Sequence, residues 1–303
     1  MKILVANPAG NVTVFVLESV PGIDERRALA ASIMADKGLG AEQVGFVITP
    51  MADAKGPMSG NNPGNNDGID DGLHAGLWHL EMSGGEFCGN AARAFALYAA
   101  RVQGLEGQAK ISVSVSGAEG PVQVEVDLAN NRAFAEMPKP LAVGTLDFEL
   151  HPAKDCGKAA AFYTPAACRE LPVVIFNGIT HVIAPDIEPA EEVFHAIKFL
   201  VEQKFSGSPA LGVMFYDTES RIMRPLVHVR SVDTLVFESS CGSGSAALGV
   251  WLSRELGDGD HRFSISQPGG IIETLVKKKE GKITGISIGG MVELGEPRMF
   301  VFP

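Results

Sequence analysis

The 303-residue chain contains an internal repeat, and this repeat restricts the possible folds more than any other feature of the sequence. The segment 10–14 (GNVTV) resembles 178–182 (GITHV), and 44–47 (VGFV) resembles 211–214 (LGVM). The spacing between the two segments agrees in both halves to within one residue, and a helix-like stretch lies between them. Each half therefore predicts a strand, a helix and a second strand in the same order.

A cysteine opens the next matching segment in each half. Cys88 lies in EFCGNAA and Cys241 in ESSCGSG, and apolar residues at helical spacing follow both. Gly104 and Gly257 lie 16 residues after Cys88 and Cys241, respectively. Because glycine adopts the left-handed conformation at a helix C-terminus most easily, we expect the two helices to end at these glycines.

Alternating apolar residues after each helix predict two strands joined by a glycine turn. These strands are expected at 111–115 and 122–126 in the first half, and at 263–266 and 271–276 in the second half. The combined pattern predicts an α+β fold with two pseudo-symmetric domains. Each domain is expected to be a curved, mainly antiparallel sheet or barrel around one central helix.

The two halves also predict where the domains lie in the chain. Residues 1–140 are expected to form the N-terminal domain with Cys88, and residues 145–289 the C-terminal domain with Cys241. The C-terminal strand, at about 290–303, is a candidate to return to the first domain.

The composition argues against several classes of function. The net charge is -11 and the isoelectric point is near 5.1, whereas a nucleic-acid partner requires a clustered basic face. No apolar segment approaches the length that spans a membrane, and the N-terminal residues lack the features of a secretory signal. We therefore predict a soluble, cytoplasmic protein without nucleic-acid or membrane partners.

The four cysteines show neither a CxxC pair nor the spacing of a zinc site. Cys156 and Cys168 have no counterpart in the repeat, and we interpret them as small buried residues. The chain also lacks a dinucleotide-binding GxGxxG motif after a strand, and it lacks a P-loop. We therefore predict no metal and no cofactor, so that any cysteine function must come from individual thiols.

Glycine, asparagine and aspartate dominate residues 51–72, and this segment has no counterpart in the second half. The composition predicts a long loop, either a mobile surface loop or a lid over an active site. The acidic end, residues 67–71, lacks the ligand spacing and the terminal glutamate of a calcium-binding EF-hand loop.

Two thiols at matching helix starts suit an enzyme that inverts the α-carbon of an amino acid. One group must remove a proton from one face of the carbon, and a second group must return a proton to the other face. A helix N-terminus stabilises a thiolate, so that one cysteine can act as the base and the other as the acid. Small residues after Cys88 and Cys241 allow backbone N–H groups to bind the substrate carboxylate and to stabilise a carbanionic transition state.

Two interpretations of another class stay open at this point. A thiol redox or metal-sensing protein would use the same cysteines as a reversible pair, although it has no need for matching helix starts. A non-catalytic binding module would use the same residues to bind a ligand without chemistry.

The segments EFCGN (86–90), SCGSG (240–244) and QPGG (267–270) resemble the diaminopimelate epimerase superfamily. The resemblance covers essentially the whole chain. It implies a two-domain fold, a two-thiol mechanism without a cofactor and, in most members, a homodimer. The catalytic thiols map onto Cys88 and Cys241. The substrate-binding residues of the family map onto Asn11, Gly89, Asn90, Gly242 and Ser243.

One segment departs from that superfamily. Diaminopimelate epimerases carry a Glu-Arg-Gly stretch shortly before the second cysteine, and its arginine holds the distal carboxylate of the substrate. Residues 231–236 read SVDTLV, so the guanidinium that would form this ion pair is missing. The departure weakens the case for diaminopimelate as the substrate.

Four segments are similar to the histidine racemases of opine-type, staphylopine-like metallophore biosynthesis: NPAGN (7–11), EQVGF (42–46), HLEMSG (79–84) and ESSC (238–241). This likeness implies a racemase that interconverts L- and D-histidine. The substrate-binding residues that it adds are Glu42, Gln43, His79, Glu238 and Ser239.

Glu42 suits a histidine substrate chemically, because a carboxylate accepts a hydrogen bond from an imidazole N–H or pairs with an imidazolium. The alternatives within the same fold are a diaminopimelate epimerase and a racemase of another small amino acid.

Overall fold

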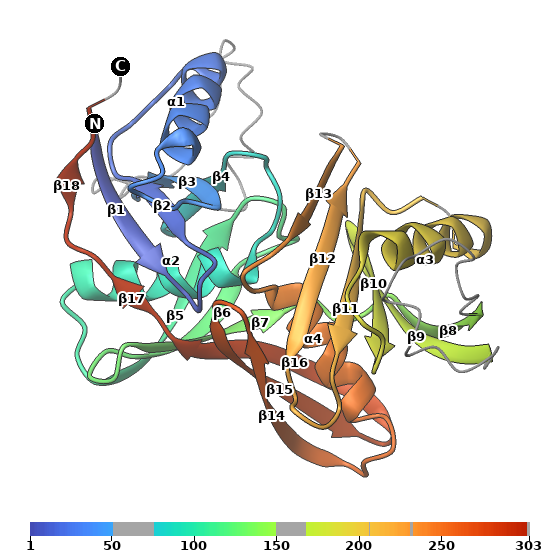
Figure 1. Cartoon of the computed structure of the whole chain (residues 1–303). Helices are drawn as coiled ribbons and strands as arrows, with labels where there is room; N and C mark the ends of the chain where they lie inside the picture. The colour runs from blue at the N-terminus through green and yellow to red at the C-terminus, as the bar shows by residue number, and fades with distance from the viewer. Residues whose placement is uncertain (51–75, 150–167, 206, 231–232, 302–303) are drawn as a thin grey trace, which may run out of the picture. The chain divides into compact units, whose positions relative to one another are not determined.

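The computed structural model describes residues 1–50, 76–149, 168–205, 207–230 and 233–301 (Figure 1). The chain divides into two compact units, one formed by Met1–Met137 with Ser287–Pro303 and the other by Pro138–Ile286. The loop expected at 51–72 and the residue Cys156 lie outside the described residues.

The described residues form four helices and two sheets (Figure 1). None of these helices is long and apolar enough to cross a membrane. The helices are α1 (Ile23–Ala35), α2 (Gly89–Val102), α3 (Glu191–Lys204) and α4 (Gly242–Leu252).

The first unit contains a mixed sheet in the order β7-β6-β5-β4-β3-β2-β1-β17, with β18 paired to β1. The pairs β2/β3 and β4/β5 are parallel, and the other pairs with a determined register are antiparallel. Its strands are β1 (Lys2–Asn7), β2 (Thr13–Val16), β3 (Gln43–Ile48), β4 (His79–Met82), β5 (Gln108–Val115), β6 (Val122–Asp127), β7 (Arg132–Met137), β17 (Glu293–Leu294) and β18 (Arg298–Met299).

The second unit contains a six-stranded sheet in the order β13-β12-β11-β10-β9-β8, and the antiparallel pair β14/β15. Only β10/β11 is parallel within the six-stranded sheet. Its strands are β8 (Ala142–Glu149), β9 (Cys168–Phe176), β10 (Ile179–Pro185), β11 (Ala210–Tyr216), β12 (Met223–Val229), β13 (Thr234–Phe237), β14 (Gly259–Gln267) and β15 (Gly270–Lys279); β16 (Lys282–Met291) contains the boundary between the units.

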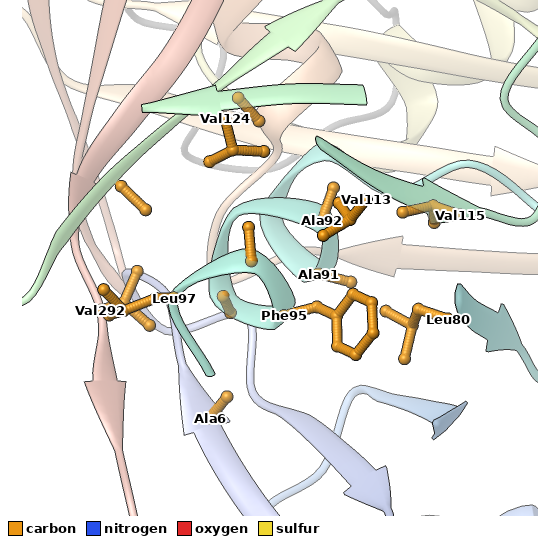
Figure 2. Packing of buried hydrophobic residues seen from close by; sticks show 14 of the residues in the cluster. Ala6, Leu80, Ala91, Ala92, Phe95, Leu97, Val113, Val115, Val124 and Val292 are labelled. Atoms are coloured by element: carbon orange, nitrogen blue, oxygen red, sulfur yellow. The ribbon is translucent and has the colours of Figure 1, made fainter. Parts of the chain in front are cut away.

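Helix α2 forms the centre of the first unit because it is rich in alanine and almost wholly buried (Figure 2). The small side chains bring its backbone close to β5, β6 and β7, and Phe95 fills the remaining space. The ring of Phe95 meets that of Phe15 edge to face, with centroids 5.9 Å apart. Helix α1 packs instead with Val44 and Phe46 of β3, in a separate core cluster. The central helix predicted for this half is therefore confirmed.

In the second unit, α4 is the buried helix and packs mainly against β15 and β10. A Cβ at Gly249 would lie 2.5 Å from the side chain of Thr274, so glycine is required for the close approach of α4 to β15. Helix α3 covers the six-stranded sheet through Phe194, Ile197 and Val201. The strand–helix–strand units predicted from the repeat are present as β2–α1–β3 and β10–α3–β11, each with a parallel strand pair.

The ends of the two buried helices differ, although the sequence predicted a glycine cap for both. Gly104 has φ +70°, and Leu105 N–H donates to the carbonyl of Ala100 at 3.1 Å, so this prediction is confirmed. The prediction for Gly257 is wrong, because α4 ends at Leu252. The Lys278 ammonium from β15 instead donates to carbonyl oxygens beyond that end, including Ser253 O at 2.9 Å.

Candidate active site

Cys88 is the N-cap residue of α2, as its position before a run of small residues predicted. Its backbone is extended, with φ -122° and ψ 113°, and its sulfur accepts a hydrogen bond from Ala91 N–H at 3.4 Å. The residue after Cys88 must be small because neighbouring side chains leave no room for a Cβ. A Cβ at Gly89 would lie 2.5 Å from the sulfur of Met137 and 2.9 Å from Ile288. Only glycine therefore fits directly after this cysteine without rearrangement of its neighbours.

Cys241 occupies the same position at the start of α4, with φ -121° and ψ 114°. Its sulfur accepts a hydrogen bond from Gly244 N–H at 3.4 Å and lies 3.6 Å from the hydroxyl of Ser243. Both described free cysteines thus use the sulfur as the helix-capping acceptor, a role usually filled by an oxygen of serine, threonine or aspartate.

Burial controls the ionisation of both thiols. Desolvation raises the pKa of Cys88 to about 11; the charge of Glu86 adds to this rise, while Ala91 N–H and the Gln43 side chain oppose it. Desolvation also raises the pKa of Cys241 well above its usual value, and the charge of Glu238 raises it further. The helix N-termini therefore do not hold a thiolate in the free protein, and both sulfurs are protonated at neutral pH.

Three polar side chains predicted as substrate contacts lie around Cys88. The thiol of Cys88 lies 3.8 Å from Asn11 Oδ1, and Asn11 Nδ2 donates to Glu42 Oε2 at 2.8 Å. Gln43 reaches the same sulfur, and its buried Oε1 has no hydrogen-bond partner among the described residues. An unsatisfied buried acceptor is costly, so this oxygen is suited to a donor brought by a ligand.

Asn90, another predicted contact, follows directly in the first turn of α2 and is buried. Its Oδ1 accepts a hydrogen bond of 3.1 Å from Nε of Arg93. Arg93 is itself fully buried and donates to the carbonyl of Met291 at 3.1 Å. This chain of hydrogen bonds fixes the orientation of Asn90.

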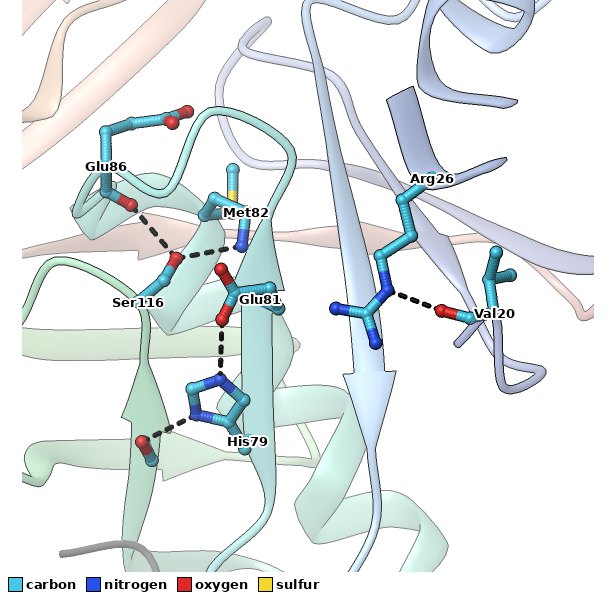
Figure 3. Close-up of polar contacts among 8 residues, drawn as sticks. Val20, Arg26, His79, Glu81, Met82, Glu86 and Ser116 are labelled. Atoms are coloured by element: carbon cyan, nitrogen blue, oxygen red, sulfur yellow. Dashed lines mark hydrogen bonds and ion pairs between the residues drawn. The ribbon is translucent and has the colours of Figure 1, made fainter. Parts of the chain in front are cut away.

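His79, predicted as a substrate contact in the first half of the chain, lies on the face of its sheet opposite to α2. Leu80 and Met82 belong to the core packed around α2, so the alternation of β4 directs His79 and Glu81 to the opposite face of the sheet. There the imidazole of His79 lies 3.0 Å from Glu81 Oε2 (Figure 3). Its other ring nitrogen lies 2.7 Å from Ser114 Oγ. The buried imidazole of His79 thus joins β4 to β5 through its hydrogen bond with Ser114.

In the second unit, the predicted residues gather at the start of α4. Glu238 forms a hydrogen bond with the Cys241 thiol, and Gly242 begins the helix. The carbonyl of Ser239 accepts a hydrogen bond of 2.7 Å from Gly269 N–H. Ser243 Oγ lies between the sulfur of Cys241 and Nε2 of His181, 2.9 Å from the latter.

Sequence reasoning left two residues near Cys241 out of the site. Burial lowers the pKa of His181 to about 3, so the imidazole beside Ser243 is neutral. Gln267 accepts a hydrogen bond from the backbone N–H of Cys241 at 2.8 Å. The QPGG motif around Gln267 was the available signal. Within the described part of the chain, no group of three or more His, Cys, Asp or Glu residues is placed to hold a metal ion.

Comparison with known proteins shows the family to which the chain belongs. Residues 71–296 match the family model described as the histidine racemase CntK N-terminal domain. The chain is 32% identical over 287 residues to a histidine racemase of Fusobacterium nucleatum. The aligned residues cover 92% of this chain and 90% of that protein. It is 28% identical over 274 residues to a histidine racemase of Staphylococcus aureus, covering 90% and 87% of the two chains.

Solved structures show the same fold at low sequence identity. A predicted epimerase from Pseudomonas aeruginosa is similar with a TM-score of 0.60 and 12% identity, covering 100% of this chain and 99% of the other. A hydroxyproline epimerase from Agrobacterium vitis has a TM-score of 0.58 and 12% identity, covering 98% and 91%. These likenesses concern the fold alone, and they confirm the predicted α+β class of the diaminopimelate epimerase type.

Proposed function

The chain belongs to the histidine racemase CntK family, and we propose that it interconverts L- and D-histidine. The observation that carries the proposal is the pair of cysteines, Cys88 and Cys241, which cap two buried helices with the same local geometry. Inversion of a carbon needs one proton-transfer group for each face, and a repeated fold supplies two such groups.

In the proposed reaction, the thiolate of one cysteine removes the α-proton of the bound enantiomer. The C–H electron pair stays on the substrate as a carbanion, whose charge spreads into the α-carboxylate. The thiol of the other cysteine then donates its proton to the opposite face of the carbon. The two cysteines exchange protonation states in the process, and the reverse direction uses them in the opposite roles.

Substrate binding favours formation of the thiolate, which burial disfavours in the free protein. Glu86 and Glu238 each raise the pKa of the nearer thiol by their negative charge. The ammonium group of an amino acid placed beside either carboxylate offsets that charge, which lowers the pKa of the thiol. This coupling favours formation of the base when the substrate is bound.

The starts of α2 and α4 suit the substrate α-carboxylate. Helix N-termini present free N–H groups and a partial positive charge to an anion. Gly89 and Asn90 follow Cys88, and Gly242 and Ser243 follow Cys241, so small or fixed side chains border each of these N–H groups. The same donors stabilise the negative charge that develops in the transition state.

The group around Asn11 is proposed to recognise the imidazole of histidine. Asn11 orients the carboxylate of Glu42 through a 2.8 Å hydrogen bond, and that carboxylate can accept an imidazole N–H. Gln43 Oε1 offers a second acceptor for the substrate, because it is buried and no residue in the described part of the chain donates to it. Neither diaminopimelate nor a small aliphatic amino acid has an aromatic N–H to place there.

We further propose that D-histidine made by this enzyme serves the biosynthesis of an opine-type metallophore. A homodimeric assembly, which the family resemblance implies, and a cytoplasmic location are parts of the same proposal.

A substrate panel tests the proposed specificity. Reduced protein is incubated with L-histidine, D-histidine, LL-diaminopimelate, L-proline and L-alanine, and the products are separated by chiral chromatography. We expect both histidine enantiomers to approach an equal mixture and the other substrates to stay unchanged. Conversion of diaminopimelate or of another amino acid in preference to histidine overturns the substrate. Stable enantiomers in all cases favour the redox or binding interpretations of the thiols.

A further inference from the structure

A closed ring of three hydrogen bonds surrounds the backbone of Cys241. The N–H of Cys241 donates to Gln267 Oε1 at 2.8 Å, and Gln267 Nε2 donates to Ser245 Oγ at 2.9 Å. The hydroxyl of Ser245 completes the ring by donating to the carbonyl of Cys241 at 2.7 Å. Both polar groups of the Cys241 backbone are thus held by side chains.

The ring lies in the interior of the second unit. Gln267 and Cys241 are each 6% exposed, and Ser245 is fully buried. Hydrogen bonds are stronger in such surroundings, and an unpaired donor or acceptor there is costly. The ring therefore restricts the position of Cys241 more than the same bonds would at the surface.

The orientation of the Gln267 amide follows from its partners. Rotation of the amide by 180° would face Nε2 toward the N–H of Cys241, which is also a donor. It would also face Oε1 toward Ser245, whose hydroxyl proton is already used by the carbonyl of Cys241. Only one orientation satisfies all three residues.

Gln267 supplies a hydrogen-bond acceptor for the N-cap N–H that no side chain of α4 can provide. In a capping box, the third helical residue reaches back to the N–H of the N-cap residue. That residue is Gly244 here, which has no side chain, although its own N–H binds the sulfur of Cys241. Gln267 comes from the end of β14 and provides the missing acceptor.

We propose that Gln267 is a positioning residue that holds Cys241 as the N-cap of α4, with its sulfur in reach of Gly244 N–H. The amide is neutral, so it adds no charge to that of Glu238 beside the thiol. Among the described residues, the other titratable group near this sulfur is His181, which is neutral and contacts Ser243 Oγ. The part of this inference that concerns turnover rests on the proposed racemase function, whereas the part that concerns the thiol does not.

The test follows the reactivity of each thiol separately. Wild type, Gln267→Met and Gln267→Glu are alkylated with iodoacetamide over a range of pH, and the modification of each cysteine is followed by peptide mass spectrometry. Methionine has a similar size but no acceptor, and an ionised glutamate keeps the acceptor while it adds a charge. In Gln267→Met the fixed N-cap is lost, which weakens the bond from Gly244 N–H. In Gln267→Glu the added negative charge opposes ionisation of the thiol. Both changes make the thiolate of Cys241 harder to form.

We expect the alkylation rate of Cys241 at a given pH to fall about tenfold in both variants, which corresponds to a rise of about one pKa unit. The profile of Cys88 should stay as in wild type. The matched controls are Gln123→Met and Gln123→Glu, because Gln123 is exposed and is also bonded to a serine hydroxyl, that of Ser112. Both control variants should leave both profiles unchanged.

Kinetics with L-histidine complete the test. We expect the kcat of the Gln267 variants to fall about tenfold while KM stays within about twofold, because the residue acts through the thiol and not on the substrate. Alkylation profiles of Cys241 that coincide with wild type in both variants overturn the inference. Shifted profiles without any turnover of histidine by wild type retain the inference and contradict the proposed function instead. If the Gln267 variants do not fold, Ser245→Ala must shift the Cys241 profile in the same direction by a smaller factor, and an unchanged profile overturns the inference.

Discussion

Cys88 and Cys241 begin their helices in the same conformation, with φ and ψ of -122° and 113° for Cys88 and of -121° and 114° for Cys241. Each sulfur accepts the N–H of the residue three positions later at 3.4 Å. Two identical caps in unrelated places would be a coincidence. In a repeated fold they are the expected result of one motif used twice, and they support the proposal that both thiols have the same chemical task.

The first prediction concerns these thiols. Cys88→Ser and Cys241→Ser should each lower the rate of histidine inversion by at least about a hundredfold, because a serine hydroxyl does not ionise in the range where a thiol does. The rate is measured by chiral chromatography with both enantiomers. Cys156→Ser is the matched control, since no role is assigned to this cysteine, and it should retain full activity. Near-normal inversion by either active-site variant would contradict the assigned roles.

The second prediction concerns the glycine after Cys88. A methyl group added by Gly89→Ala meets the side chain of Met137, so we expect the free energy of unfolding to fall by about 1–3 kcal/mol. In the background of Met137→Ala the contacts with the Met137 side chain are removed and only the contact with Ile288 remains, so Gly89→Ala should then cost at least about 1 kcal/mol less. Urea denaturation of the four proteins of this cycle measures the difference. Equal costs in both backgrounds would show that steric contact with Met137 does not select the glycine.

The third prediction concerns recognition of the imidazole. Glu42→Gln keeps the size of the side chain but removes its charge, and it should raise the KM for histidine about tenfold with a smaller effect on kcat. Steady-state kinetics with both enantiomers measure the two constants. Glu202→Gln removes a carboxylate from an exposed ion pair with Arg230 and should leave both constants unchanged. A large fall in kcat at constant KM in Glu42→Gln would place Glu42 in the proton-transfer steps instead.

The fourth prediction concerns stability at alkaline pH. The pKa of the Cys88 thiol rises from 9.0 to about 11 on folding because of burial. Between these values the unfolded chain has lost a proton that the folded chain keeps, so the free energy of unfolding falls as the pH rises from 9 to 11.

Cys88→Ser removes this group and should therefore weaken the decline of stability over that range. Urea denaturation at several pH values, with wild type and variant side by side, separates this effect from other groups that titrate there. Parallel pH profiles of the two proteins would contradict the raised pKa.

Much of the local structure could be predicted from the sequence because repeated glycines and cysteines mark the positions where the backbone is most restricted. Alternating apolar residues located β6, which runs from Val122 to Asp127, close to the prediction. The end of α4 could not be predicted, because Lys278 stabilises it from a strand distant in the sequence. Propensity rules consider only neighbours along the chain. The carbonyl groups after the end of α4 accept hydrogen bonds from Lys278, which belongs to another element.

Two features of the candidate site also depend on packing that cannot be read from neighbouring residues in the sequence. His79 is predicted as a substrate contact because its segment resembles a family motif, and the alternation with Leu80 and Met82 places its side chain on the face of the sheet opposite to α2. Its contact with the substrate stays a prediction. The raised pKa of Cys88 and of Cys241 was not foreseen, because helix position is visible in the sequence whereas burial depends on packing by remote segments.

The central claim is that two thiols exchange the α-proton of histidine, and proton exchange in D2O tests it most directly. Reduced wild type, Cys88→Ser and Cys241→Ser are each incubated with L-histidine, with deuterium followed by NMR and configuration by chiral chromatography. We predict deuterium at the α-carbon together with inversion in wild type, and loss of inversion in both variants. Wild type that neither exchanges the α-proton nor inverts histidine would contradict the central claim.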